Sequence, residues 1–188
     1  LDEIQPLLVG MDAFNIEGCW EKMRKPSTNI LRDRKLAMCA QACVDSVLWD
    51  AVGKALDAPL YKLWGGYSDK LPVTCIAGYY EEGKTLLDFS KEMEQIRRDG
   101  YAGCKFKVGG LSAAEDAQRV LAARDAAGDE FMLMIDANQG YSVGQAVDLC
   151  RRIQGAGIRW FEEPCRWHND RRGLRDVRTG ERPWQVRN

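Results

Sequence analysis

The sequence lacks any C-x-x-C pair, and its seven cysteines are an odd number. Both features argue against a disulfide framework and against a zinc ribbon. We therefore expect reduced cysteines in the core. Cys39 and Cys43 stand four apart in an Ala-rich helical run, so we expect them to lie together on one buried helix face.

The sequence also has little net charge, −1 over 188 residues, with acidic and basic side chains scattered along most of it. This balance gives no reason to expect nucleic acid or an anionic membrane as a partner. No apolar run approaches the length of a membrane span, and the N-terminus has no signal-peptide pattern, so we expect a cytoplasmic protein. The one basic run, between residues 166 and 178, is interpreted as a solvated helix face.

The first part of the chain, residues 1–70, is predicted to be helical. Asp12 or Asn15 can cap a helix that carries Ile16, Trp20 and Met23 on one side. A longer helix is expected from about residue 32 to 57. Apolar residues repeat every four positions along it, the pattern of a helix packed on something larger; they are Val44, Leu48, Val52 and Leu56.

From residue 71 to 178, short apolar runs alternate with amphipathic helices. Strands are predicted at 71–78, 102–109, 131–138 and 158–164, and helices at 84–98, 112–126, 142–154 and from 170 on. This alternation predicts an α/β fold with a parallel sheet of right-handed βαβ units, either a barrel or a doubly wound sheet. A closed eight-stranded barrel needs about 250 residues, so only half of one is expected here.

Charged or amide side chains end three successive predicted strands. The three pairs are Lys105 and Lys107, Asp136 and Asn138, and Glu162 and Glu163. The carboxyl ends of parallel strands form the active-site face of such folds. Their carboxylates suit a hard cation such as Mg²⁺, and burial and like charge would lower the pKa of a lysine beside it, which would make that lysine a usable base.

Each of these residues also has a structural interpretation. The lysines can pack their stems and extend their heads into solvent, and Asp136 and Asn138 in "DANQG" can be turn formers. Recurrence on three successive strands favours a functional site. His168, the one histidine, fits a surface loop better than a catalytic role, and the glycines of "VGG" after the second strand lack the spacing of a dinucleotide loop and are interpreted as a turn.

Four segments together resemble the enolase superfamily, and within it the mandelate racemase and muconate lactonizing enzyme group. "CVDSVLWDAVGKALDAPLYKLWGG" is similar to the helical part of that group's α+β capping domain. "KFK" resembles its K-x-K motif on the second barrel strand, "DAN" its D-x-N on the third, and "EEP" its motif on the fourth. The resemblance implies a partial (β/α)8 TIM barrel of about four βα units, preceded by part of the cap.

The resemblance also implies a chemistry. Asp136 and Glu162 would be Mg²⁺ ligands, with Asn138 beside the metal and Glu163 supporting it. Lys107 would remove a proton alpha to a carboxylate, giving an enediolate, and Lys105 would help to hold that carboxylate; Asn138 and His168 would contact the substrate. The implied enzyme is a lyase or isomerase, an acid-sugar dehydratase or racemase that forms homo-oligomers.

The sequence departs from the family pattern at both ends. The cap's first β-region precedes "LDEIQPLLVG" in the family, and a third acidic metal ligand is expected on a fifth strand, near Asn188. Glu181 is the one carboxylate of the tail and lies in no predicted strand. We therefore expect a chain truncated at both ends, with an atypical tail over residues 179–188.

Two rival functions remain open. The chain could be a non-catalytic fragment, with unpaired sheet edges and weak Mg²⁺ binding. It could also be a Schiff-base aldolase that uses Lys105 or Lys107, although that chemistry gives no role to Asp136 and Glu162.

Overall fold

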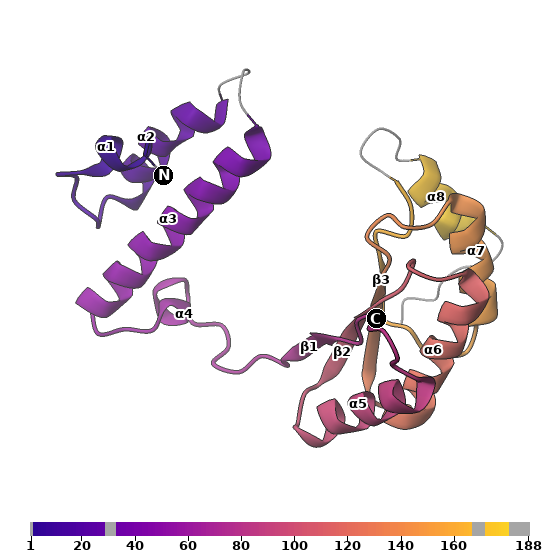
Figure 1. The fold of residues 1–188 in the computed structure, drawn as a ribbon. Coiled ribbons are helices and arrows are strands. Elements are labelled where there is room, and N and C mark those ends of the chain that lie inside the picture. Colours follow the sequence, from indigo (N-terminus) through magenta and orange to yellow (C-terminus); the bar gives the residue numbers. More distant parts are fainter. Residues whose placement is uncertain (1, 29–32, 167–171, 181–188) are drawn as a thin grey trace. The chain divides into compact units, whose positions relative to one another are not determined.

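The computed structural model describes residues 2–28, 33–166 and 172–180. The chain divides into two compact units, Leu1–Leu71 and Pro72–Asn188. The first unit is helical and the second contains the sheet, as Figure 1 shows. The expected atypical tail falls largely on residues 181–188, which lie outside the described residues.

The first unit consists of α-helices of very different lengths. They are α1 (Gln5–Leu8), α2 (Ile16–Thr28), α3 (Arg34–Ala55) and α4 (Leu60–Leu63). Asn15 is the residue that caps α2, because its Oδ1 accepts a hydrogen bond from the Gly18 amide at 3.1 Å. Met23 of α2 is fully buried, and α2 packs against α3. The helical character predicted for this part of the chain is what the structure shows.

Helix α3 begins at Arg34 because the Asp33 side chain accepts hydrogen bonds from the Lys35 and Leu36 amides. The predicted start near residue 32 lies outside the described residues. The prediction that Cys39 and Cys43 are buried is wrong: both are exposed. Helix α3 buries a different part of its surface, at Gln41, Val52 and Gly53, so the four-residue spacing placed the cysteines together but on the wrong face.

Helix α3 also corrects the expectation that no segment approaches the length of a membrane span. Among the described residues, this one helix is long and apolar enough to cross a membrane by length and composition. Core helices of soluble proteins meet the same criteria.

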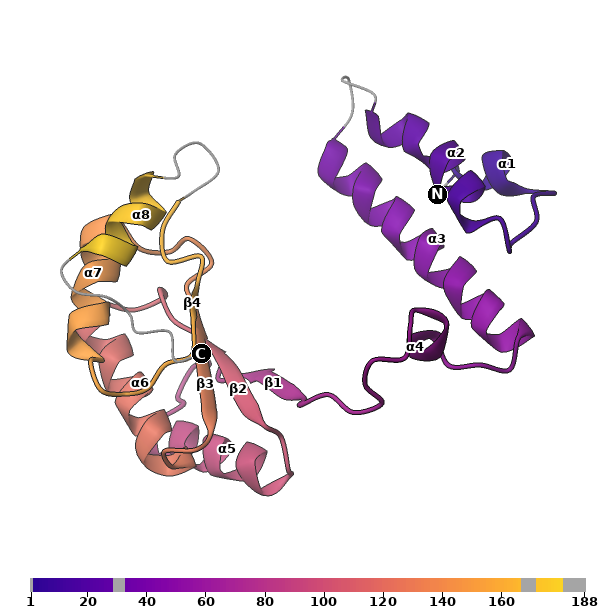
Figure 2. The same cartoon turned by 180° about the vertical axis from the view of Figure 1, so that it is seen from behind.

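The second unit contains a fully parallel sheet in the order β1-β2-β3-β4. Its strands are β1 (Thr74–Ala77), β2 (Gly103–Lys107), β3 (Met132–Asp136) and β4 (Phe161–Glu162), and its helices are α5 (Leu86–Arg98), α6 (Ala113–Ala127), α7 (Val143–Arg152) and α8 (Arg172–Thr179). Figures 1 and 2 show that these helices all lie on one side of the sheet. The predicted alternation of parallel strands and helices is confirmed, and it is that of part of a (β/α) barrel.

Strand β4 is much shorter than the predicted 158–164. Main-chain bonds extend the pairing slightly: Ile135 N of β3 donates to the carbonyl of Trp160, just before β4, at 3.1 Å, and Ala137 N, just after β3, donates to the Glu162 carbonyl at 3.1 Å. The strand ends because Glu163 has a φ of 41°, in the left-handed region that extended strands do not use. The chain therefore turns directly after Glu162.

Three helices of this unit begin with the same local device, a capping box. Thr85, Ser112 and Ser142 each accept a hydrogen bond from the backbone three residues later, and the side chains of Asp88, Glu115 and Gln145 bond back to the cap. Each box fixes where the chain leaves the strand-end loop and enters the helix. The lengths of the loops at the carboxyl edge of the sheet are set in this way.

The core lies between the sheet and its helices. Alternate strand residues point into it, among them Phe106, Leu133 and Ile135, and Phe89 and Met93 of α5 belong to the same buried cluster. The Phe89 and Phe106 rings meet edge to face, with centroids 5.3 Å apart. Because neighbouring residues of a strand point to opposite sides, the charged residues between these apolar ones face away from the helices.

Candidate active site

Three charged residues occupy one level of the sheet where the strands end. Lys107 of β2 pairs in register with Asp136 of β3, and Asp136 pairs with Glu162 of β4. Residues in register on parallel strands point to the same side, so the three side chains stand in a row on the helix-free face. Lys105 lies two residues earlier on β2 and points to the same side.

Short contacts join these side chains. Lys107 Nζ donates to Asp136 Oδ2 at 2.7 Å and to Asn138 Oδ1 at 2.6 Å. Lys105 Nζ donates to Glu162 Oε2 at 2.7 Å and lies 3.5 Å from Asp136 Oδ2. The structure thus brings together five of the residues predicted from the sequence to form a site.

The cluster is half-enclosed, and its charges are balanced. The Lys105 and Lys107 side chains are 16% and 22% exposed, Asp136 is 4% exposed and Glu162 42%. Burial opposes ionisation of Asp136, but hydrogen bonds from Lys107 and the Asn138 amide outweigh it and hold the pKa of Asp136 below its usual value. The carboxylates therefore make the partial burial of two ammonium groups tolerable.

The pKa of Lys105 is shifted in the opposite direction from that expected for a lysine that acts as a base. The hydrogen bond to Glu162 raises the pKa of Lys105 above its ordinary value, against the opposing effect of burial. The charges that Lys105 meets in the structure are the carboxylates of Glu162 and Asp136. Lys105 is thus a firmly protonated hydrogen-bond donor in this arrangement.

The loop after β3 holds Asn138 in an unusual backbone conformation. Asn138 and Gln139 have φ values of 44° and 66°, and the Asn138 amide bonds to Asp136 Oδ1 at 2.9 Å. The Gln139 amide donates to the Glu163 carbonyl at 2.8 Å, which joins this turn to the end of β4. The turn-forming and functional interpretations of "DAN" are therefore compatible, since the turn aims Asn138 at Lys107.

The donor set fits a hard divalent cation. The ammonium of Lys105 contacts both Asp136 and Glu162, so the two carboxylates are close enough to share one positive charge. Mg²⁺ prefers carboxylate oxygens and needs few of them, since it keeps several waters. Within the described residues, no group of three or more His, Cys, Asp or Glu side chains stands together.

Several predicted features lie outside the described residues. His168 belongs to the 167–171 segment, and Glu181 and Asn188 belong to the 181–188 segment. The substrate contact predicted for His168 and the position expected for a third metal ligand therefore stay predictions.

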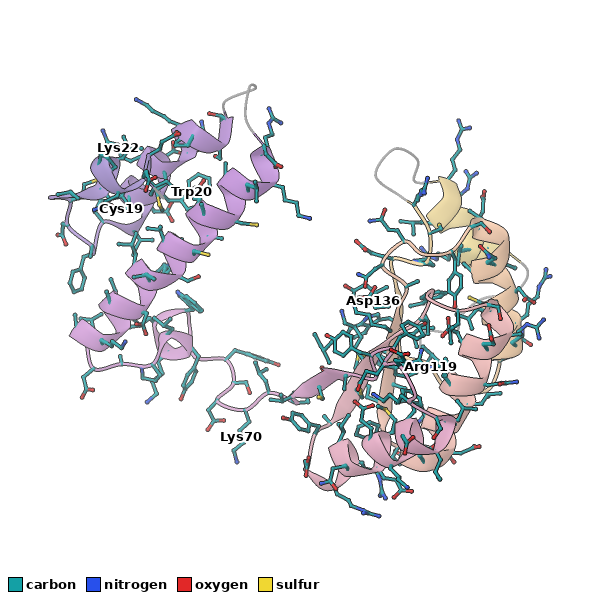
Figure 3. All side chains as sticks on the ribbon, in the orientation of Figure 1. Cys19, Trp20, Lys22, Lys70, Arg119 and Asp136 are labelled. Carbon is teal, nitrogen blue, oxygen red and sulfur yellow. The ribbon has the colours of Figure 1, made fainter. Side chains whose placement is uncertain are left out.

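Sequence reasoning missed one group of polar residues beside the site. Asp116 and Arg119 of α6 are buried, at 0% and 7% exposure, and pair at 3.0 Å. Figure 3 labels Arg119 on the helix side of the sheet and Asp136 at the strand end. The sequence did contain one signal, the position of Asp116. It lies on the apolar face of α6 with Ala113, Ala117 and Val120, where a charged side chain is unusual.

A cavity of about 450 Å³ also lies beside this group. It is lined by loop and helix residues including Tyr80, Lys84, Phe89 and Arg119, and neither Lys105 nor any of the three charged residues of the strand-end row lines it. The cavity is therefore separate from the candidate active site.

A parallel sheet with helices on one face, and with lysines and carboxylates at its carboxyl edge on the other, defines a (β/α)-barrel enzyme. Residues 88–186 match the family described as "Enolase C-terminal domain-like", and residues 1–65 match "Mandelate racemase / muconate lactonizing enzyme, N-terminal domain". The chain belongs to the mandelate racemase and muconate lactonizing enzyme family of the enolase superfamily. The resemblance read from the motifs is confirmed, and α3 lies within the N-terminal domain match.

Individual relatives agree with this assignment. The chain is 37% identical to arabinonate dehydratase of Saccharolobus solfataricus over 86% of its own length and 43% of the relative. It is 36% identical to D-galactarolactone cycloisomerase of Agrobacterium fabrum over 84% of its own length and 42% of the relative. A mandelate racemase/muconate lactonizing enzyme from a marine actinobacterium, whose structure was solved with magnesium, is 56% identical to the chain, with a TM-score of 0.84. The match covers 94% of this chain and 49% of that protein. The chain spans under half the length of these relatives.

Proposed function

We propose that the full-length protein is a Mg²⁺-dependent enzyme that removes the proton alpha to the carboxylate of an acid sugar. The observation that carries the proposal is the row Lys107–Asp136–Glu162, with Lys105 bridging its two carboxylates. Relatives named as acid-sugar dehydratases and cycloisomerases support the substrate class. The magnesium in a similar solved structure supports the metal.

Asp136 and Glu162 would hold the metal, and Asn138 would stand beside it. A bound Mg²⁺ would supply positive charge that stabilises the negative charge developing on the substrate carboxylate. The carboxylates come from adjacent strands and are fixed by the sheet register, so they need little rearrangement to share a cation. Glu163 would support this arrangement through its carbonyl bond to the Gln139 amide.

Lys107 is the residue proposed to act as the base. As the C–H bond alpha to the carboxylate breaks, the proton passes to Lys107 Nζ and the electron pair spreads onto the carboxylate oxygens, giving an enediolate. Lys105 donates a hydrogen bond to those oxygens and so stabilises their developing negative charge. His168 remains a proposed substrate contact.

The enediolate has two chemical outcomes. Loss of a hydroxyl from the next carbon gives, after tautomerisation, a 2-keto acid, whereas return of the proton to the opposite face inverts the centre. The dehydratases among the relatives favour the first outcome. The proposal also includes a cytoplasmic location, which the acid-sugar dehydratases among the relatives support, and a homo-oligomeric state, which stays a prediction.

A screen of acid sugars tests the proposed function. The full-length protein is incubated with Mg²⁺ and a panel of aldonic and aldaric acids, and NMR follows consumption and products. We expect at least one acid sugar to be converted to a 2-keto acid, and Asp136→Asn to abolish the conversion. Conversion by Asp136→Asn at the wild-type rate would contradict the roles proposed here.

A further inference from the structure

The loops after three strands converge on one buried carboxylate, that of Asp116. Tyr80, from the loop after β1, donates to Asp116 Oδ1 at 2.6 Å. The Gly109 amide, after β2, donates to Oδ2 at 2.8 Å, and Tyr141, after β3, donates to Oδ2 at 2.6 Å. A single side chain on α6 thus fixes the backbone or side chain of each loop that borders the candidate active site from β1 to β3.

Arg119 extends this arrangement to the main chain of Lys107 itself. Its guanidinium donates to the Lys107 carbonyl at 2.7 Å and to the Gly78 carbonyl at 2.6 Å. The paired ladder of β1 and β2 ends one residue earlier, at Ala77 and Phe106. Arg119 therefore bridges the two strands at the level where their own hydrogen bonds stop, which is the level of the Lys107 side chain.

The approach of Arg119 depends on a glycine at the end of β1. Gly78 has a φ of 64°, and a Cβ there would lie 2.6 Å from Phe106 Cβ and 2.7 Å from the Phe89 ring. The guanidinium stacks over the Tyr80 and Phe89 rings, 4.2 Å and 4.8 Å from their centroids. These contacts hold it in one orientation.

Within the group formed by Asp116, Arg119, Tyr80 and Tyr141, the charges are paired and the two tyrosine hydroxyls have an acceptor. Asp116 and Arg119 neutralise each other inside the protein, which a buried pair requires. Burial first, and then the hydrogen bond to Asp116, raises the pKa of Tyr80 and of Tyr141, so both hydroxyls remain protonated donors. None of these side chains contacts Asp136 or Glu162 in the bonds described.

We propose that Asp116 and Arg119 are positioning residues, which hold the backbone of Lys107 and of the following glycines so that the Lys107 ammonium group stays aimed at Asp136 and Asn138. This inference rests on the proposed function for its catalytic consequence, though not for its structural one. The group binds the main chain of the base, and its hydrogen bonds described above include none to Asp136, Asn138 or Glu162.

The test compares two arginines of the same helix. Arg119→Lys replaces a planar fork with a point charge that cannot serve Asp116 and two carbonyls together. Arg124→Lys is the matched control, because Arg124 also bonds backbone carbonyls, those of Gly128, Phe131 and Ala156, but at the opposite edge of the sheet. Hydrogen–deuterium exchange of the full-length proteins is followed by mass spectrometry.

In Arg119→Lys we expect amide exchange at residues 108–110 to be faster by about tenfold or more, the factor that loss of one hydrogen bond to a charged group implies. In Arg124→Lys the increase should fall on segments 128–131 and 156–158 and spare residues 108–110. Unchanged exchange at 108–110 in Arg119→Lys, or an equal increase there in both variants, would overturn the inference. Tyr80→Phe, which removes the acceptor of the Gly110 amide at 3.1 Å, gives a second and milder variant with the same expectation for Gly110.

A kinetic readout separates positioning from general stabilisation. For Arg119→Lys we expect kcat for exchange of the substrate's alpha proton to fall by about 10²-fold with KM nearly unchanged, as displacement of a base implies. An unchanged kcat would refute positioning. If the wild-type protein exchanges no alpha proton, the proposed function fails, and the amide-exchange comparison still decides whether Asp116 and Arg119 hold this segment.

Discussion

Replacing Lys107 with alanine is expected to lower the rate of alpha-proton exchange by about 10²–10⁴-fold, the usual contribution of a positioned general base. The effect should be large because Lys107 belongs to the strand-end row and lies within 2.7 Å of both Asp136 and Asn138. The measurement is the rate at which an acid sugar loses its alpha-proton NMR signal in D₂O with Mg²⁺.

An exposed lysine provides the control for this experiment. Lys91 lies on α5 in the same unit and is exposed. Lys91→Ala should exchange the alpha proton at the wild-type rate, because it removes the same group far from the strand ends. Lys107→Ala at that same rate would remove Lys107 from the mechanism.

Replacing Arg119 with methionine is expected to lower the free energy of unfolding by about 3–5 kcal/mol. The substitution keeps much of the apolar stem but leaves the Asp116 carboxylate, which is 0% exposed, without its counter-charge. It also removes the donors to the Lys107 and Gly78 carbonyls. Urea unfolding followed by circular dichroism measures the change.

A surface pair of similar geometry calibrates this expectation. Arg152 and Asp148 lie 2.9 Å apart on α7, with side chains 48% and 47% exposed. Arg152→Met should change stability by about 0–1 kcal/mol, since solvent screens exposed pairs. A loss in Arg119→Met no larger than this would show that the buried pair is not a main support of the strand ends.

Much of the site was predictable because its residues end successive strands. Alternation along a strand puts Lys105 and Lys107 on one side, and the register of a parallel sheet puts Asp136 and Glu162 beside them. These are local rules that do not depend on the rest of the molecule. The motifs "KFK", "DAN" and "EEP" therefore carried the prediction of both fold and site.

What the sequence could not supply was set by tertiary contacts. The spacing of Cys39 and Cys43 placed them on one helix face, but which face of α3 is buried depends on how α2 packs against it. Asp116 and Arg119 sit three apart on a helix, where a surface ion pair is the ordinary interpretation. Only the convergence of Tyr80, Gly109 and Tyr141 shows that this pair is internal.

We propose that the strand-end row removes an alpha proton with the help of Mg²⁺. The most direct measurement is alpha-proton exchange by the full-length wild-type protein in D₂O, before and after removal of divalent metal with a chelator. We expect exchange with Mg²⁺, its loss on chelation and its return when Mg²⁺ is added back. Exchange that continues unchanged after chelation, or that never occurs with any acid sugar in the presence of Mg²⁺, would show that the proposed mechanism is wrong.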